Sequence, residues 1–131
     1  MNVGNALARG QRAAEARMID ACVIERATGT SVDEYGNEVT TYETVYEGKC
    51  RVMSWAVATT SPDVGQQRMD LLRFYVHVPV SATGVRVNDR VHVTSSRDPE
   101  LTEIDRFFRV ENLAHKTDQT ARRLPVEEIV S

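Results

Sequence analysis

From Asp20 onward, apolar and polar side chains alternate along the chain. This period of two places alternate side chains on opposite faces of an extended strand, which leaves one face for a core. Leu72, Phe74 and Val76 show the pattern most clearly, and Val78 continues it. It recurs in the segments 20–27, 40–57, 69–79, 106–115 and 121–130, and in Val85, Val87, Val91 and Val93 on the two sides of Asn88-Asp89. Five or six short strands with polar turns predict a mainly β protein, folded as an antiparallel barrel or sandwich.

Polar segments containing Gly, Pro, Asn or Asp mark the expected turns between these strands. Residues 28–38 predict a turn rich in Asp, Gly and Asn, and residues 58–68 predict a long polar loop. Asn88 is expected to take the left-handed position of a tight turn. Gly48 has two interpretations: it closes a hairpin, or it lies in a bulge that bends one long strand.

The first eighteen residues have a different pattern, rich in Ala and Arg and poor in β-branched side chains. Leu7, Ala14 and Met18 fall on one helical face, and Asn5 is placed to cap the start of the helix. A helix with so narrow an apolar stripe is marginal alone. It is therefore either docked on the domain or offered to a neighbour.

At 131 residues and a net charge of −3, the chain has the length of one domain and no excess of basic side chains. We expect an N-terminal contact helix over residues 1–18 and a β domain over residues 19–131. Proteins that grip phosphates are usually basic, so general nucleic-acid binding is disfavoured. No apolar stretch approaches the ~20 residues of a membrane span, no secretory signal is recognisable, and two cysteines do not make a disulfide framework. We expect a cytoplasmic setting and no membrane partner.

The motifs that would carry catalysis or cofactor binding do not occur in this sequence. It has no nucleophile elbow, no Gly-rich phosphate loop and no pair of Cys or His at metal-ligand spacing. Cys22 and Cys50 are expected to be buried free thiols, whereas the imidazoles of His77, His92 and His115 are expected on the surface. We therefore expect no enzyme, with no catalytic residue, no metal and no cofactor.

Two blocks of opposite charge are separated along the chain. Residues 28–48 contain five acidic residues and no Lys or Arg, whereas residues 106–123 contain five basic and two acidic residues. Either both blocks are solvated faces, or the acidic edge of one subunit meets the basic edge of the next, as in a ring. Under the second hypothesis the subunit or adaptor contacts are Leu7, Arg12 and Met18 in the helix, Asp33, Glu34 and Glu38 in the turn, and Arg122 and Arg123 in the last strand.

The order of short motifs along the chain adds a resemblance to a known family. After the N-terminal helix come ARMIDACVIERATGT, a turn with Tyr35-Gly36-Asn37, VYEGKCRV, RFYVHVP, GVRVNDRVHV, DPELT, FFRVENLAHKT and TARRLPVEEI. In this order the chain resembles, over nearly its whole length, the head-closure or stopper family of tailed bacteriophages, in the form found in phages of actinobacteria. One departure is the tight turn, which usually has Gly before the Asp, whereas this chain has Asn88-Asp89.

The resemblance implies a small antiparallel β-barrel of about six strands with one N-terminal helix. It also implies a ring of six or twelve copies in the virion neck, assembled in the host cytoplasm, that closes the DNA-filled head and joins it to the tail. The partners would be an adaptor or portal ring above, a tail-terminator or tail-tube protein below, and DNA that passes without sequence recognition. The resemblance favours the bent-strand interpretation at Gly48. The loop expected to project into the channel consists of Thr59, Thr60, Ser61, Pro62, Asp63, Val64, Gly65, Gln66 and Gln67.

Three other functions stay open on the sequence. A tail-terminator subunit would form the next ring down the same particle. A free-standing small barrel would bind oligonucleotides with an affinity that falls as salt rises. An enzyme would assemble its site from several strands, inside a deep pocket with perturbed titratable groups.

Overall fold

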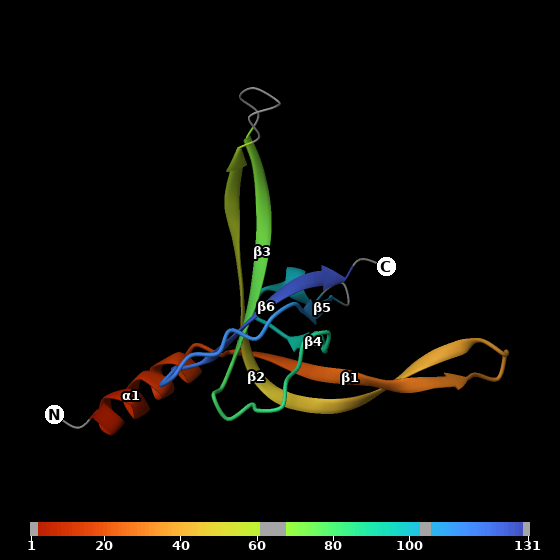
Figure 1. Cartoon of the computed structure of the whole chain (residues 1–131), viewed down its shortest axis with the longest axis horizontal. Helices are drawn as coiled ribbons and strands as arrows, with labels where there is room; N and C mark the ends of the chain where they lie inside the picture. The colour runs from red at the N-terminus through yellow and green to blue at the C-terminus, as the bar shows by residue number, and fades with distance from the viewer. Residues whose placement is uncertain (1–2, 61–67, 103–105, 130–131) are drawn as a thin grey trace.

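The computed structural model describes residues 3–60, 68–102 and 106–129, and gives only the backbone of residues 55–60 and 68–72. Its elements are α1 (Val3–Ala16), β1 (Asp20–Val32), β2 (Glu38–Thr60), β3 (Arg68–Val78), β4 (Arg90–Ser95), the short 3-10 turn η2 (Pro99–Leu101), β5 (Phe107–Val110) and β6 (Arg122–Ile129). The prediction of a mainly β fold with an N-terminal helix is confirmed (Figure 1).

The six strands of the described residues form one antiparallel sheet that closes in a ring. Their order is β1-β2-β3-β6-β5-β4, and β4 pairs back with β1. Each of these strands therefore bonds to a neighbour on both sides, so the interpretation as a sandwich of two separate sheets is wrong. Closure satisfies the backbone groups that an open sheet edge would leave unpaired.

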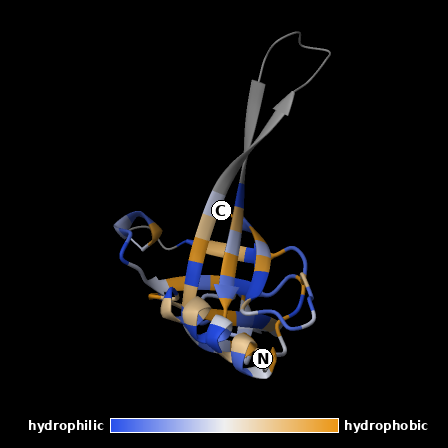
Figure 2. Ribbon diagram, turned by 90° about the vertical axis from the view of Figure 1, so that its left-hand side faces the viewer, coloured by the Kyte–Doolittle hydropathy of each residue, from blue (hydrophilic) through white to orange (hydrophobic). Residues whose placement is uncertain are grey.

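The core lies inside this ring and is built from alternate residues of the strands. On β3, Val76 and Val78 are buried, and the ring centroid of Phe74 lies 5.2 Å from that of Phe108. Hydrophobic and hydrophilic bands alternate along the strands in Figure 2, as the period of two predicts. The largest fully buried side chains are those of Cys22, Ile24, Cys50, Val76, Val78, Val91, Phe108 and Val110.

β2 is one long strand that bends, which confirms the bent-strand interpretation for the region of Gly48 (Figure 1). It pairs with β1 as far as Cys50 and with β3 from Arg51 onward, so the bend coincides with the change of partner. The register shift between β1 and β2 lies beside Val45 rather than at Gly48. Gly48 instead leaves room for the ring of Tyr46, because a Cβ there would lie 2.9 Å from the tyrosine hydroxyl oxygen.

Both long hairpins extend further than the sequence predicted. β1 continues to Val32, so the predicted turn over 28–38 shrinks to residues 33–37. Thr59 and Thr60 pair with β3 as strand residues, which corrects their assignment to a loop. Threonine favours strands, but Thr59 and Thr60 stand in a polar stretch of the sequence without the apolar alternation that would mark a strand. The rest of the predicted channel loop, Ser61, Pro62, Asp63, Val64, Gly65, Gln66 and Gln67, lies outside the described residues.

The turn predicted at Asn88-Asp89 is present, whereas the strand predicted over 106–115 is shorter than expected. Residues 84–89 form an irregular loop and β4 begins only at Arg90, because the left-handed conformation of Asn88 (φ 76°) cannot continue an extended strand. The predicted conformation of Asn88 is thereby confirmed. β5 ends at Val110, and residues 111–121 then run as an irregular segment beside α1 (Figure 1).

α1 packs outside the ring against this 111–121 segment. The Gln11 side-chain amide donates to the carbonyl of Gln119 at 3.4 Å, and a Cβ at Gly10 would lie only 2.9 Å from the Thr120 side chain. No residue of the helix is buried. The helix is thus docked on its own chain, but by a shallow contact.

The helical residues chosen from the sequence take different positions. Asn5 lies inside α1, so its assignment as the cap is wrong. Leu7 and Ala14 are half-buried on the inner face, and Arg12 is exposed. Met18 follows the end of the helix and is only 5% exposed, so its side chain belongs to the interior of this chain.

Candidate interaction site on the β1–β2 arm

β1 and β2 continue beyond the closed sheet as a two-stranded ribbon, residues 27–42, here called the β1–β2 arm. β1 pairs with β4 only as far as Glu25, so β2 is its sole partner in the arm. β2 and β3 form a second ribbon, the β2–β3 arm, residues 55–60 and 68–73, beyond the pairing of β3 with β6. Figure 1 shows the two arms leaving the body in different directions. A two-stranded ribbon is marginally stable in water, so each arm depends on contacts at its root or with another molecule.

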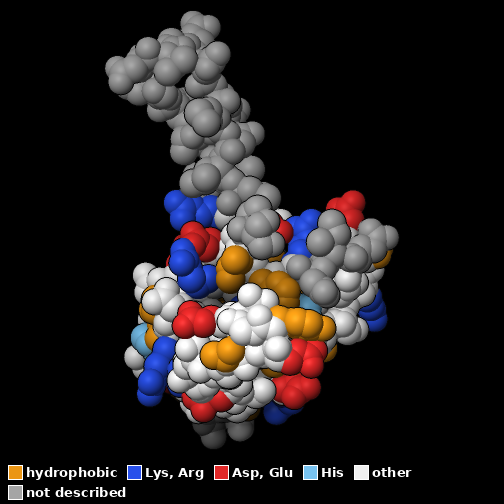
Figure 3. Space-filling model, turned by 90° about the vertical axis from the view of Figure 1, so that its right-hand side faces the viewer, with side chains coloured by type: hydrophobic (Ala, Val, Ile, Leu, Met, Phe, Trp, Pro, Cys, Tyr) orange, Lys and Arg blue, Asp and Glu red, His pale blue; other side chains and the backbone are white. Residues whose placement is uncertain are grey.

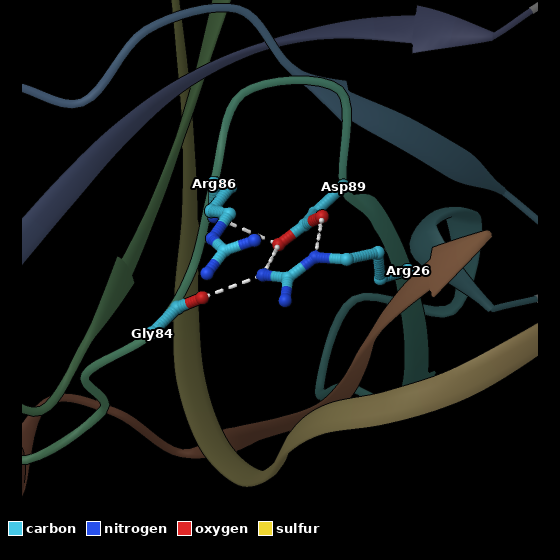
Figure 4. Close-up of polar contacts among 4 residues, drawn as sticks. All are labelled: Arg26, Gly84, Arg86 and Asp89. Carbon is cyan, nitrogen blue, oxygen red and sulfur yellow. Dashed lines mark hydrogen bonds and ion pairs between the residues drawn. The ribbon is translucent and has the colours of Figure 1, made fainter. Parts of the chain in front are cut away.

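The root of the β1–β2 arm is held by Arg26 of β1 and Asp89 of the 84–89 loop (Figure 4). The guanidinium binds both carboxylate oxygens at 3.0 Å and donates to the Gly84 carbonyl at 2.6 Å. The Arg86 N–H donates to the same carboxylate at 2.8 Å. Hydrogen bonding to Asp89, which is 3% exposed, raises the pKa of Arg26. A bidentate pair with a buried carboxylate fixes the direction in which the arm leaves the sheet.

The sequence indicated one partner of this ion pair, the carboxylate, but not the other. Asp89 is two and four residues before the buried Val91 and Val93, so the alternation of side chains places its carboxylate on the same, core-facing side. A buried carboxylate needs a charged or hydrogen-bonding partner. Arg26 is 63 residues away along the chain, and only the pairing of β1 with β4 brings it to Asp89.

A second set of contacts at the root centres on Arg90 of β4. Its guanidinium carbon lies 3.7 Å from the ring centroid of Tyr42 and 4.6 Å from that of Phe107. Arg90 also pairs with Glu25 at 3.2 Å, and Phe107 stacks on His92 with 4.5 Å between the ring centroids. Cation–π and stacking contacts of this kind join β2, β1, β4 and β5 where the arm begins.

The arm ends in a tight turn whose shape is fixed by its own residues. One carboxylate oxygen of Asp33 accepts hydrogen bonds from the N–H groups of Tyr35 at 2.9 Å and Asn37 at 2.8 Å. Gly36 has a φ of 82°, a conformation that favours glycine. This turn holds Tyr35 outward with 81% of its surface exposed.

The tip of the arm combines apolar and acidic side chains. Val32, Tyr35 and Val39 are exposed, and the carboxylates of Glu34 and Glu38 lie among them. Figure 3, which views the molecule from this side, shows hydrophobic and acidic side chains next to one another. Exposed aromatic and β-branched residues on a projecting element are typical of an interaction surface. The sequence-based contact set included the acidic residues and missed Tyr35, although an aromatic residue inside an acidic turn was the signal for it.

The basic residues of the C-terminal part do not form one continuous free edge. Arg106 pairs with Glu128 at 3.4 Å, and Arg109 pairs with Glu127, so β6 neutralises these two charges within the chain. The charges that remain for contacts outside the chain are therefore fewer than the sequence indicated.

Three basic residues of this part remain near the surface. Arg122 is half-buried and donates from Nε to the Val80 carbonyl at 2.8 Å. Lys116 and Arg123 are exposed. The two predicted contacts of the last strand thus differ, since Arg122 is oriented by its own chain and Arg123 projects into solvent.

A cavity of about 320 Å³ opens between the 82–85 loop and the 113–124 segment. Its apolar lining comes from Ala82, Val85, Leu113 and Leu124, and its polar lining includes His115, Gln119, Arg122 and Arg123. Its volume is at the lower end of the range for ligand pockets, which suits a single side chain better than a large ligand.

A smaller cavity of about 210 Å³ lies between α1 and the sheet, and Arg17, Arg51, His77 and Arg123 are among its lining residues. Burial lowers the pKa of His77 to about 4, and the positive charges of Arg123 and Arg51 act in the same direction. His77 is half-buried here, which corrects its assignment as a surface imidazole.

The remaining candidates for chemistry lie inside the sheet. Cys22 and Cys50 are buried free thiols, as predicted. Hydrogen bonding to Cys22, together with burial, raises the pKa of the Cys50 thiol and keeps it protonated. Within residues 3–60, 68–102 and 106–129, no three His, Cys, Asp or Glu side chains gather closely enough to hold a metal ion. The described helices include none that is long and apolar enough to cross a membrane.

Comparison with known proteins gives one match. A family model with the description "family of unknown function (DUF6093)" matches residues 10–127, which is most of the chain. No curated protein and no solved structure matches.

Proposed function

The chain belongs to this family of unknown function, DUF6093, and we propose that it is a structural subunit of the neck ring of a tailed bacteriophage. In this proposal the closed sheet is the small β-barrel of the subunit, and the ring closes the DNA-filled head and joins it to the tail. The observation that carries the proposal is the pair of arms that project from the closed sheet without a core of their own.

Projecting ribbons fit a subunit whose neighbours complete its fold. Beyond the residues that pair with β4, the β1–β2 arm carries exposed apolar side chains that no other part of the described chain covers. The helix adds a third element, docked on its own chain by a shallow contact and without a buried residue. In a ring, each such element finds the same surface on the next copy, so one weak contact is repeated at every subunit boundary.

The overall charge supports a role beside a DNA channel. The net charge of −3 means that the subunit has no excess of positive charge to bind passing DNA. Lys and Arg side chains that neutralise phosphates would hold the DNA and slow its passage. The β2–β3 arm, which leaves the body in its own direction, is the element that we assign to the channel side (Figure 1).

A small nucleic-acid-binding barrel is the second candidate, and the cluster of Arg90 with Tyr42 and Phe107 favours it, since aromatic and Arg side chains stack on bases. Here the rings already cover the guanidinium, and His92 covers Phe107. Binding of a short single-stranded oligonucleotide at low salt, lost steeply as salt rises, would favour this candidate. We expect no such binding.

The test of the neck-ring proposal is a phage that carries a nonsense mutation in the gene for this chain, with the same phage complemented in trans as the control. We expect heads that package DNA and then lose it, together with finished tails that stay unattached. Heads that retain their DNA beside tails of irregular length would assign the chain to the tail-terminator ring instead. Normal infectious particles would overturn both assignments.

A further inference from the structure

We propose that the tip of the β1–β2 arm of one copy binds in the cavity between the 82–85 loop and the 113–124 segment of a second copy. The inference rests on the proposed ring and names the surface through which its subunits join. The aromatic side chain of Tyr35 would enter the cavity, and the neighbouring carboxylates would pair with the basic residues that line it.

The arm tip presents one exposed aromatic side chain on a turn of fixed shape. Tyr35 is 81% exposed, and Asp33 and Gly36 fix the turn that carries it. An aromatic side chain on a pre-shaped turn loses little conformational freedom on binding, so more of its contact energy contributes to affinity. Glu34 and Glu38, which precede and follow Tyr35 in the sequence, are exposed and add negative charge to the tip.

The cavity has the complementary chemistry. Its lining combines apolar side chains, among them Val85 and Leu124, with the basic Arg122 and Arg123. The hydrogen bond from Arg122 to the Val80 carbonyl holds that guanidinium in place before anything binds. An apolar pocket with one oriented cation and a second, exposed one is suited to an aromatic ring whose sequence neighbours are carboxylates.

The positions of the two surfaces require a second copy. The arm tip lies at one end of the longest axis of the molecule, whereas α1 and the 111–121 segment beside it lie at the other (Figure 1). The cavity lies at the body, where its lining residue Gly84 accepts a hydrogen bond from Arg26 at the arm root, and the tip of the extended arm points away from it (Figure 1). A contact between two different surfaces of identical copies repeats head to tail, and it closes into a ring when the rotation between copies divides a full turn.

Charge complementarity favours a second copy over another kind of partner. The acidic tip and the basic cavity occur in one sequence, and each is the counterpart of the other in sign and in mixed apolar character. Exposed ion pairs are individually weak and screened by salt. The contact should therefore be transient between free copies and should become stable when repeated around a ring.

The test is a disulfide trap in the full-length chain. Asn37→Cys places a thiol at the tip beside Tyr35, and Thr83→Cys places one at the cavity. Under mild oxidation at high protein concentration, we expect the double variant to form a ladder of disulfide-linked oligomers on a non-reducing gel. Each single-cysteine variant is expected to form only disulfide-linked dimers, because it has one introduced thiol. The matched control combines Asn37→Cys with Thr94→Cys on the exposed end of β4, and it should not form the ladder.

A second substitution makes the trap specific for the aromatic ring. In the double-cysteine background, Tyr35→Ala should slow ladder formation by about tenfold or more, as loss of a central aromatic contact does, and Tyr35→Phe should restore it. High salt should weaken the ladder. A ladder of equal strength in the Thr94→Cys control, no ladder in the test variant, or no effect of Tyr35→Ala would each overturn the inference.

The result is separable from that of the neck-ring proposal. A specific ladder from a chain whose loss leaves phage particles normal would keep this contact and discard the neck assignment. Unattached tails and leaking heads without a ladder would do the reverse. Cross-linking of Asn37→Cys to a different protein in assembled particles would also overturn the inference.

Discussion

At the scale of single residues, the β1–β2 arm is oriented by a buried charge. Asp89 is 3% exposed and accepts hydrogen bonds from Arg26 of the arm root and from the backbone of its own loop (Figure 4). Burial makes this carboxylate dependent on its partners, because a charge that loses them in a low-dielectric site is costly.

We expect Asp89→Asn to lower the free energy of unfolding by about 2–3 kcal/mol, since it weakens charge-assisted hydrogen bonds at a buried site. Urea unfolding followed by circular dichroism measures the change. Glu111→Gln, which removes an exposed carboxylate, is the matched control and should change stability by less than about 0.5 kcal/mol. Equal effects of the two substitutions would show that Asp89 does not hold the arm.

His77 gives the protein a pH dependence whose sign is fixed. Its pKa is lowered to about 4 in the folded chain, against an unfolded value of about 6.5. Between these values the unfolded chain binds the extra proton, so stability falls as pH drops from about 6.5 to 4 and is unaffected above that window. The imidazole is half-exposed, so the slope stays below the limiting value of about 1.4 kcal/mol per pH unit.

His77→Gln tests this dependence because glutamine does not titrate. Chemical unfolding at a series of pH values should show a shallower loss of stability for the variant between about pH 6.5 and 4. The carboxylates that titrate at lower pH are common to both proteins. Parallel curves for the two proteins across this window would contradict a half-buried imidazole with a lowered pKa.

At the scale of elements, sequence reasoning succeeded where one face of a strand is buried and failed where neither face is. The alternation of Phe74, Val76 and Val78 located β3, and the same pattern located the other core strands. Residues 28–32 of the β1–β2 arm are exposed on both faces and therefore carry no apolar period, and Thr59–Thr60 stand in a polar stretch of the sequence, so both segments resemble turns or loops in the sequence alone. Their strand character comes from pairing with the opposite strand, which single-sequence patterns do not reveal.

The helix is the element whose removal the sheet should tolerate. α1 has no buried residue, and its contacts include the 111–121 segment and an ion pair between Glu15 and Lys49 at 3.1 Å. Deleting residues 1–16 should leave the near-ultraviolet and far-ultraviolet signatures of the strand domain and a cooperative unfolding transition, while blocking incorporation into particles. Met18→Ala in the full chain is the control, and should destabilise by about 2–3 kcal/mol because Met18 is buried. Loss of cooperative unfolding in the truncated chain would make α1 part of the core.

At the scale of the whole molecule, the acidic arm and the basic cavity give the subunit two unlike ends. The sequence showed the separation of charge, but not that Arg106 and Arg109 are neutralised by β6. That neutralisation depends on which strands become neighbours when the sheet closes. The neck assignment itself came from the order of motifs, and the geometry of the arms adds a physical reason for assembly.

Because these contacts are charged and individually weak, we expect the isolated protein to be a monomer or a weak oligomer at low concentration. Sedimentation velocity over a concentration series should show a single slow species that broadens toward larger ones as concentration rises. A stable ring of six or twelve copies at all concentrations would mean that a stronger interface than the arm contact holds the subunits together.

The central claim, that this chain forms a ring in the phage neck, is tested most directly by electron cryo-microscopy of purified particles. The account predicts a symmetric ring at the head–tail junction, in which each subunit matches the closed six-stranded sheet and its two projecting arms. Density for this chain along the tail, within the shell of the head, or nowhere in particles that are otherwise complete would contradict it.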